Sequence, residues 1–296
     1  AFADATLPKP RVEPVPTTAK SRVLFFESIM SSEMEHNEAE ISQGVLHMAS
    51  ALREVGGVDV DFLFAQVKMP IVGDDRPVQG LDDLGDLIRD EPIHLICITL
   101  LEGYWEGALQ LIRGIRETGC RARIAVGGVM PTLTPEHVAA HLPEVTYICR
   151  GAGEYFLPHL VRIAGQQTVD EPLSDAQLHA FSMMDGLIVR ESVGERRVLV
   201  SGRADRTPKV EDLDAVTLDL GFVAARHLIH GLEISTSRGC IHKCTFCNII
   251  GRESYQARST ESVLELLSRY ADRYQELFGD QIPHTAYRLH IADDDF

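Results

Sequence analysis

The sequence predicts an α/β protein with a doubly wound parallel sheet at the front and the beginning of a second β/α domain behind it. From residue 22 to about residue 165, short apolar runs alternate with amphipathic stretches. This pattern is typical of parallel strands that are covered by helices on both faces. From residue 231, a short apolar run, a cysteine-rich loop and a long amphipathic stretch follow one another, which indicates a further strand and helix.

In the front part, five strands alternate with five helices. Strands are expected at 23–27, 58–64, 93–100, 123–126 and 145–149, where β-branched and other apolar residues gather. Helices are expected at 40–55, 81–89, 104–118, 135–141 and 154–163, where apolar residues recur with helical spacing. This succession fits a flavodoxin-like fold, in which ligands bind beyond the carboxyl ends of the strands.

The remaining segments give the predicted domain boundaries. A flexible leader over 1–20 precedes the first domain over 21–165, a connector over 166–230 follows, and a second domain covers 231–296. The connector has a possible hairpin around Gly194 and an extended run from Pro208. In the second domain, strands at 232–236 and 287–292 flank a helix at 260–278 that Ser259 or Thr260 caps. These elements amount to about two β/α units, since each unit of a β/α barrel takes roughly 30 residues.

Composition and charge exclude several functional classes. The chain has 296 residues, and 44 acidic residues against 28 basic ones give a net charge of −16. Nucleic acid is therefore not expected as the main partner, because phosphate binding needs concentrated Lys and Arg. No run of roughly 18 apolar residues predicts a membrane span. Residues 1–20 lack the apolar core of a signal peptide, and we expect a cytoplasmic protein.

The chain has six cysteines, of which three fall within eight residues. Cys240, Cys244 and Cys247 have the spacing Cys-x3-Cys-x2-Cys, whereas Cys97, Cys120 and Cys149 are scattered and are expected to be buried, inert thiols. Three thiolates can hold three irons of a four-iron cubane and leave the fourth iron open to another ligand. A zinc site is the alternative, but zinc prefers four protein ligands and no nearby histidine has a usual spacing. A disulfide is disfavoured because three close thiols cannot all pair.

The cysteine spacing, with Phe246 directly before the last cysteine, resembles the radical S-adenosylmethionine superfamily. The resemblance implies a 4Fe-4S cluster whose open iron is chelated by S-adenosylmethionine, and an electron donor such as flavodoxin or ferredoxin. Electron transfer would then yield a 5'-deoxyadenosyl radical. The resemblance also implies that Phe246 packs near the adenosyl group, and that residues 231–296 form the N-terminal part of a partial (β/α)6 barrel.

An acidic run at the end of the last predicted strand begins with Asp293 and Asp294. In the superfamily, such a strand-end motif lies close to bound S-adenosylmethionine, which the resemblance implies here for both residues. A solvated acidic turn is an equally good interpretation of the sequence.

Glycines mark the ends of two predicted strands in the front domain. Gly127 and Gly128 end the fourth strand, and Gly151, Gly153 and Glu154 follow the fifth. A flat ligand can approach the backbone closely where side chains are missing, although strand-to-helix turns also use glycine. Ahead of a cysteine loop, this arrangement resembles the cobalamin-binding module that precedes many radical enzymes. The resemblance implies that these five residues shape the corrin site.

Two further features bear on the cobalamin prediction. Thr99, at the end of the third predicted strand, is a candidate to hydrogen-bond the buried nucleotide tail of the cofactor. Modules that ligate cobalt from below carry Asp-x-His-x-x-Gly after the first strand, whereas residues 27–32 read Glu-Ser-Ile-Met-Ser-Ser, and His36 lacks the flanking Asp and Gly. We therefore expect the lower face of the cobalt to have no histidine ligand.

Taken together, the motifs resemble the cobalamin-dependent radical S-adenosylmethionine family. The resemblance implies a small-molecule substrate and, most simply, methylation of an unactivated carbon or phosphorus centre. A cyclase or rearrangement enzyme with the same cofactors is one alternative. A zinc-stabilised ligand-sensing module without catalysis is the other. The sequence identifies no catalytic side chain beyond the cofactor ligands.

Overall fold

The computed structural model describes residues 21–30, 43–53, 60–69, 85–88, 92–193, 196–202, 208–228, 231–247, 249, 254–281 and 288–293, and every structural statement here concerns those residues. Its centre is a seven-stranded sheet with the order β2-β1-β3-β4-β5-β6-β7. The strands are β1 (Ser21–Met30), β2 (Val60–Met69), β3 (Leu95–Thr99), β4 (Arg123–Gly127), β5 (Tyr147–Cys149), β6 (Leu187–Val193) and β7 (Arg196–Ser201).

The first five strands are mutually parallel and follow the order 2-1-3-4-5. This order is that of the flavodoxin-like fold, and it brings the carboxyl ends of β3, β4 and β5 to one edge of the sheet. The predicted doubly wound α/β domain is therefore confirmed as a mixed α/β fold with a mostly parallel sheet.

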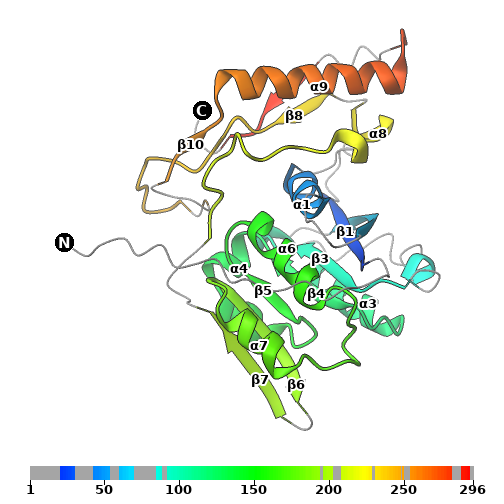
Figure 1. The fold of residues 1–296 in the computed structure, drawn as a ribbon, viewed down its shortest axis with the longest axis vertical. Coiled ribbons are helices and arrows are strands. Elements are labelled where there is room, and N and C mark those ends of the chain that lie inside the picture. The colour runs from blue at the N-terminus through cyan, green and yellow to red at the C-terminus, as the bar shows by residue number, and fades with distance from the viewer. Residues whose placement is uncertain are drawn as a thin grey trace.

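Helices cover both faces of this sheet (Figure 1). They are α1 (Gln43–Arg53), α3 (Trp105–Glu117), α4 (Val129–Leu133), α5 (Pro135–His141) and α6 (Gly153–Ala164), with a 3-10 turn η1 (Glu102–Tyr104) before α3. The predicted helix at 81–89 lies mostly outside the described residues, but residues 85–88 are helical.

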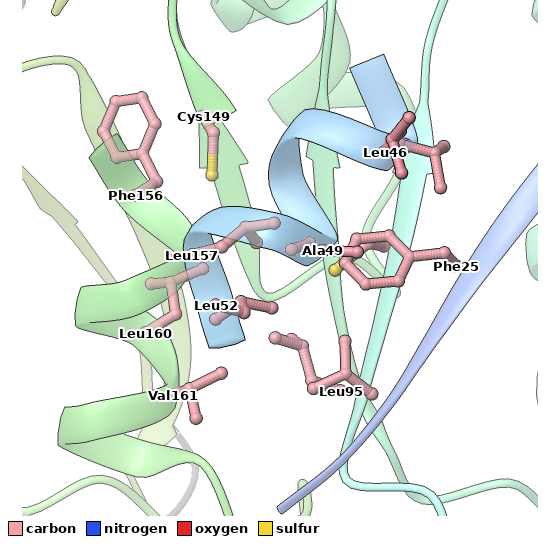
Figure 2. Packing of buried hydrophobic residues seen from close by; sticks show 14 of the residues in the cluster. Phe25, Leu46, Ala49, Leu52, Leu95, Cys149, Phe156, Leu157, Leu160 and Val161 are labelled. Carbon is pink, nitrogen blue, oxygen red and sulfur yellow. The ribbon is translucent and has the colours of Figure 1, made fainter. Parts of the chain in front are cut away.

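Alternation along the strands explains how one sheet builds two cores. Leu95 and Cys97 of β3 pack into the cluster formed with α1 and α6, whereas Ile96 and Ile98 pack into the cluster formed with α3. Figure 2 shows the first cluster, where the side chains of α1 and α6 meet between the helices and the sheet. Both faces are buried, which accounts for the continuous apolar runs in the sequence.

Part of the expected connector extends the sheet. β6 pairs antiparallel with β5 and β7 pairs antiparallel with β6, so the hairpin predicted around Gly194 is confirmed, with residues 194–195 outside the described part. Arg123 of β4 and Glu191 of β6 form a buried ion pair with an N–O distance of 2.8 Å. Helix α7 (Asp175–Ser182) precedes the hairpin and packs against both of its strands.

The C-terminal part lies at the end of the molecule opposite the β6–β7 hairpin (Figure 1). It contains η2 (Leu220–Phe222), α8 (Ala225–Leu228), β8 (Leu232–Ile234), β9 (Ser237–Arg238), β10 (Gln256–Ala257), α9 (Thr260–Phe278) and β11 (Leu289–Ile291). The predicted helix 260–278 is confirmed, and the Ser259 side chain caps it by accepting a hydrogen bond from the Ser262 N–H.

β8 and β11 pair in parallel on either side of α9 in the sequence, which makes one strand–helix–strand unit. Apolar residues of α9, including Leu266 and Tyr270, belong to the same buried cluster as α1 and α6. The C-terminal part therefore packs on the α1 side of the sheet. The described residues show this single unit and no barrel, so the barrel stays a prediction.

Candidate functional site

A cavity of about 660 Å³ lies at the carboxyl edge of the sheet. Its walls come from the start of α1, the end of β3, the loops after β4 and β5, residues 208–210, and the segment from Glu233 to Gly239. This is where ligands bind in flavodoxin-like folds, and the volume is in the range of small-molecule sites. The cavity is therefore shared between the first domain and the C-terminal part.

Backbone forms much of the first-domain wall. Gly128 has φ +97° and ψ −159°, a conformation open essentially only to glycine, and a Cβ there would lie 2.9 Å from Thr99 Cγ2. Gly151 also has a positive φ of +96°. A Cβ on Gly153 would lie 2.5 Å from the Met48 sulfur. The structure brings these three predicted glycines to one cavity wall. A Cβ at Gly128 or Gly153 would collide with neighbouring protein atoms, which accounts for glycine at both positions.

A smaller pocket of about 60 Å³ adjoins the cavity and reaches between the ends of β3, β4 and β5. Thr99 lines both spaces. Of the two, Gly127 lines the smaller pocket. Cys97 and Cys149 lie along the smaller pocket, and burial raises the pKa of both thiols. These thiols are neutral and buried, as the sequence predicted.

Glu154 links the two parts of the site. It lies in the first turn of α6, and its carboxylate accepts a hydrogen bond from Arg238 Nη2 at 2.7 Å. Burial alone would raise the pKa of Glu154, but the charge of Arg238 and the hydrogen bond from it hold the pKa below its usual value. Since Arg238 lies two residues before Cys240, this ion pair joins the glycine loop after β5 to the start of the cysteine loop.

His47 of α1 lies on the other side of Glu154, with its Nδ1 3.7 Å from the carboxylate oxygen. The side chain is 2% exposed and lines the cavity. Burial, together with the positive charge of Arg238, lowers the pKa of His47 to about 3 against the opposing attraction of Glu154. The imidazole is therefore neutral at physiological pH.

Asp293 follows β11 and holds the segment that leads into the cysteine loop. Its carboxylate accepts hydrogen bonds from the backbone N–H groups of Thr236, at 2.7 Å, and Ser237, at 2.9 Å, and from the Thr236 hydroxyl. Burial would raise the pKa of Asp293, but these hydrogen bonds hold it below its usual value. The structure thus gives Asp293 an anchoring role, and its predicted place beside S-adenosylmethionine stays a prediction. Asp294 lies outside the described residues.

The three cysteines of the predicted cluster site lie on one loop but differ in exposure. Cys240 is buried, Cys247 is half-buried and Cys244 is exposed, while the neighbouring Phe246 is 85% exposed. The Cys247 N–H donates to the Cys244 carbonyl at 3.2 Å. Within the described part of the chain, no three His, Cys, Asp or Glu side chains are arranged to hold a metal ion. The three cysteines therefore share one loop, but their thiols do not point to a common metal position.

Sequence reasoning missed His47 and its neighbour Gln43, which also lines the cavity. The sequence signal for these residues was the recurrence of polar residues at 43, 47 and 50 on a mostly apolar helix.

Tyr104 and Trp105 lie away from the cavity. They pack against the apolar cluster on the opposite face of the sheet, where the Trp105 ring lies 5.2 Å from that of His137.

No helix in the described residues combines the length and apolar character that a membrane crossing needs.

The comparisons with known proteins bear on the first domain. A search of curated proteins found no match to the chain. Residues 39–161 match the family model of the B12 binding domain, and the match does not reach the cysteine loop. Thr99 and the predicted glycines lie within the matched range, so the match supports cobalamin binding by this part of the chain.

Proposed function

We propose that the protein binds cobalamin in the cavity at the carboxyl edge of the sheet and acts as a radical S-adenosylmethionine enzyme that methylates an unactivated carbon or phosphorus centre. The observation that carries this proposal is the shared cavity: glycines of the B12-matching range and residues 237–239, next to Cys240, line the same space. When bound, cobalamin supplies a methyl carrier, and a 4Fe-4S cluster supplies the electron that cleaves S-adenosylmethionine.

The first-domain wall fits cobalamin. Gly128, Gly151 and Gly153 present bare backbone to the cavity, and two of them have positive φ angles that a larger residue would strain. Gly127 and Thr99 line the narrower pocket between the strands, which we assign to the nucleotide tail of the cofactor. Glu154 holds the cavity rim to Arg238 of the C-terminal part.

The cysteine loop has the donor chemistry of an iron-sulfur site but not yet its geometry. Three thiols in eight residues match three corners of a cubane, whereas their side chains are not gathered in the structure. We propose that the loop closes when the cluster forms, since metal binding and local folding are commonly coupled. Cys240 provides the fixed point because it lies two residues after β9 and is buried, and Cys244 and Cys247 provide the accessible thiols.

Anaerobic reconstitution of the full protein tests the proposal in separable steps. Iron, sulfide and cobalamin are measured first. S-adenosylmethionine is then added with a reductant, and 5'-deoxyadenosine is measured. About four iron and four sulfide per chain, one bound cobalamin and reductive formation of 5'-deoxyadenosine are the expected results. Bound zinc without sulfide would overturn the radical assignment and favour the ligand-sensing module.

Product analysis separates methylation from ring formation or rearrangement. Candidate substrates are offered with S-adenosylmethionine that carries an isotopic methyl group. Transfer of the label to the product supports the methyltransferase. An unlabelled, cyclised or rearranged product would replace methylation by the cyclase alternative and keep both cofactors.

A further inference from the structure

Three ring side chains form a cluster at the surface of the first domain, outside the cavity. The ring centroid of Trp105 lies 5.2 Å from that of His137 and 6.3 Å from that of His141, and the centroids of the two imidazoles are 4.1 Å apart. Both histidines are exposed on α5, whereas Trp105 is half-buried at the start of α3. The proposed function uses none of the three residues.

Helix α5 presents the two histidines on one face. His137 and His141 are four residues apart, and side chains at i and i+4 of a helix lie one above the other. Val138 and Leu142 are buried and fix α5 against the domain, so the imidazoles stay at the surface. Two histidines with this spacing on a helix can bind one metal ion together.

A hydrogen bond determines which nitrogen of His141 is available. The ring Nδ1 of His141 lies 2.9 Å from the His137 carbonyl oxygen, and because a carbonyl only accepts, Nδ1 carries the hydrogen and donates it. In a neutral imidazole, Nε2 then has the free lone pair. Metal-bound histidines almost always donate their other ring N–H to a carbonyl, a carboxylate or water in this way. Within the described part of the chain, the ring of His137 makes no hydrogen bond.

The distance between the rings favours a right angle between the two metal bonds. An imidazole nitrogen binds a divalent ion at about 2.1 Å and lies about 1 Å from its ring centroid, so two rings that share an ion at 90° have centroids about 4.5 Å apart. A tetrahedral angle separates the centroids by about 5 Å. The observed 4.1 Å is closer to the first arrangement. Square-planar and tetragonal sites of this kind are typical of nickel(II) and copper(II).

We propose that His137 and His141 form a surface site for a divalent transition-metal ion of tetragonal preference, nickel(II) or copper(II). The protein ligands are Nε2 of His141 and one ring nitrogen of His137, and Trp105 holds the two imidazoles in place by ring packing. Water completes the coordination, since no third His, Cys, Asp or Glu side chain joins the pair among the residues that the structure describes. The site is independent of cobalamin and of the cysteine loop.

Trp105 reports directly on this site, because it is the one tryptophan of the chain. The full, untagged protein is titrated with nickel(II) chloride at pH 7, and quenching of the tryptophan fluorescence by the bound paramagnetic ion is measured. Nickel is kept in large excess over protein, so that uptake by the cysteine loop leaves the free concentration unchanged. We expect saturable quenching of the wild type.

Loss of either histidine is expected to weaken nickel binding. Removing a group that only orients a metal ligand costs about 10–100-fold in affinity, so His137→Ala and His141→Ala are each expected to raise the half-saturating nickel concentration at least about tenfold. Both side chains are exposed, and neither substitution is expected to unfold the protein. His141→Gln keeps a polar side chain on α5 and is expected to behave like His141→Ala.

His159 on α6 provides the matched control. Its ring Nδ1 lies 2.8 Å from the Tyr155 carbonyl, four residues earlier, and its ring packs 5.3 Å from that of Tyr155. No histidine stands four residues before or after it. His159→Ala therefore removes an imidazole with the same backbone contact but no partner, and we expect it to leave the nickel titration unchanged.

Three results would each overturn the proposal. The first is quenching of the wild type that rises linearly with nickel and never saturates, which is collisional. The second is a half-saturating concentration in the His137 and His141 variants equal to that of the wild type. The third comes from competition with zinc(II), which does not quench: we expect zinc to displace nickel only at a concentration above that of nickel, and tighter zinc binding would exclude a tetragonal site.

Discussion

The glycine loop after β5 and the cysteine loop after β9 meet through one ion pair, yet they are built in different ways. The glycine loop is made of backbone whose course is set by the parallel sheet and by a positive φ angle at Gly151, as the loop after β4 is by a positive φ angle at Gly128. The cysteine loop depends on side chains, and its thiols range from buried Cys240 to exposed Cys244. A backbone-lined site can form before its ligand binds, whereas a site made of thiolates commonly needs the metal to gather them.

The largest expected effect of this difference is on the cysteine loop. Cys244→Ser removes one of three proposed cluster ligands, and we expect iron after reconstitution to fall from about four per chain to near zero while cobalamin binding persists. Iron and sulfide analysis with a cobalamin titration measures both. Cys120→Ala, a change to a thiol outside the loop, is the control and is expected to retain the iron. Full iron content in Cys244→Ser would contradict the cluster assignment.

The next effect concerns His47 and acid pH. Because its pKa is lowered from 6.5 to about 3 in the folded protein, the unfolded chain takes up a proton below pH 6.5 that the folded chain does not. Stability is therefore lost as pH falls, by about 1.4 kcal/mol per pH unit for one proton once the unfolded residue is mostly protonated. We expect urea unfolding between pH 6 and pH 4.5 to show a shallower loss for His47→Phe than for wild type. Parallel profiles would show that His47 titrates normally in the folded state.

Substitution of Gly128 is expected to lower the free energy of unfolding by a similar amount, because it strains the backbone. Gly128→Ala places a Cβ 2.9 Å from Thr99 Cγ2 in a conformation that alanine rarely adopts. We expect a loss of about 1–3 kcal/mol in the free energy of unfolding, and weaker cobalamin binding, since Thr99 and Gly128 line both pockets. Gly103→Ala is the control, because a Cβ there meets nothing within 4 Å. Equal losses in the two variants would contradict the strain argument.

The ion pair that joins the two loops gives the smallest effect. Glu154→Gln removes the partner of Arg238, and because Arg238 is 30% exposed, we expect a loss of about 1 kcal/mol at pH 7 rather than the larger cost of a fully buried pair. The pKa of Glu154 is lowered, so its contribution is present above the usual value of 4.5 and disappears as pH falls through the folded pKa. Urea unfolding at pH 7 and pH 3 measures the difference between the variants.

A surface ion pair provides the control for Glu154. Glu276→Gln removes the partner of Arg273 on α9, and Glu276 is 65% exposed. We expect its effect to stay below about 0.5 kcal/mol at either pH. If the two substitutions cost the same, the link between the glycine loop and Arg238 contributes no more than an ordinary surface pair.

Local signals predicted the parallel sheet and the long C-terminal helix well. β3 and β4 are buried on both faces, so each appears in the sequence as a continuous apolar run. Ser259 is recognisable in the sequence as a helix cap, and its side chain accepts from the N–H of Ser262, three residues later. The ends of strands were less predictable, because they depend on pairing with a neighbouring strand. β1 and β2 pair along ten residues each, whereas the apolar segments predicted strands at 23–27 and 58–64.

Long-range partners could not be predicted from sequence alone. Arg123 is a charged residue in a buried strand, and its partner Glu191 lies 68 residues further along, in a segment expected to be a connector. Similarly, Glu154 and Arg238 are 84 residues apart. Glycine positions indicate where a backbone wall can form, but the polar atoms that face it depend on which helix packs over the edge, as α1 does here.

The most direct test of a single shared site is electron paramagnetic resonance of the full protein loaded with both cob(II)alamin and the reduced cluster. Both centres are paramagnetic, and the proposal places them at one cavity, bounded by Gly151–Glu154 and by Ser237–Gly239. We predict that reduction of the cluster broadens or splits the cob(II)alamin signal, and that Cys244→Ser abolishes this change. A cob(II)alamin signal that is unaffected by a fully reduced cluster would contradict the shared site.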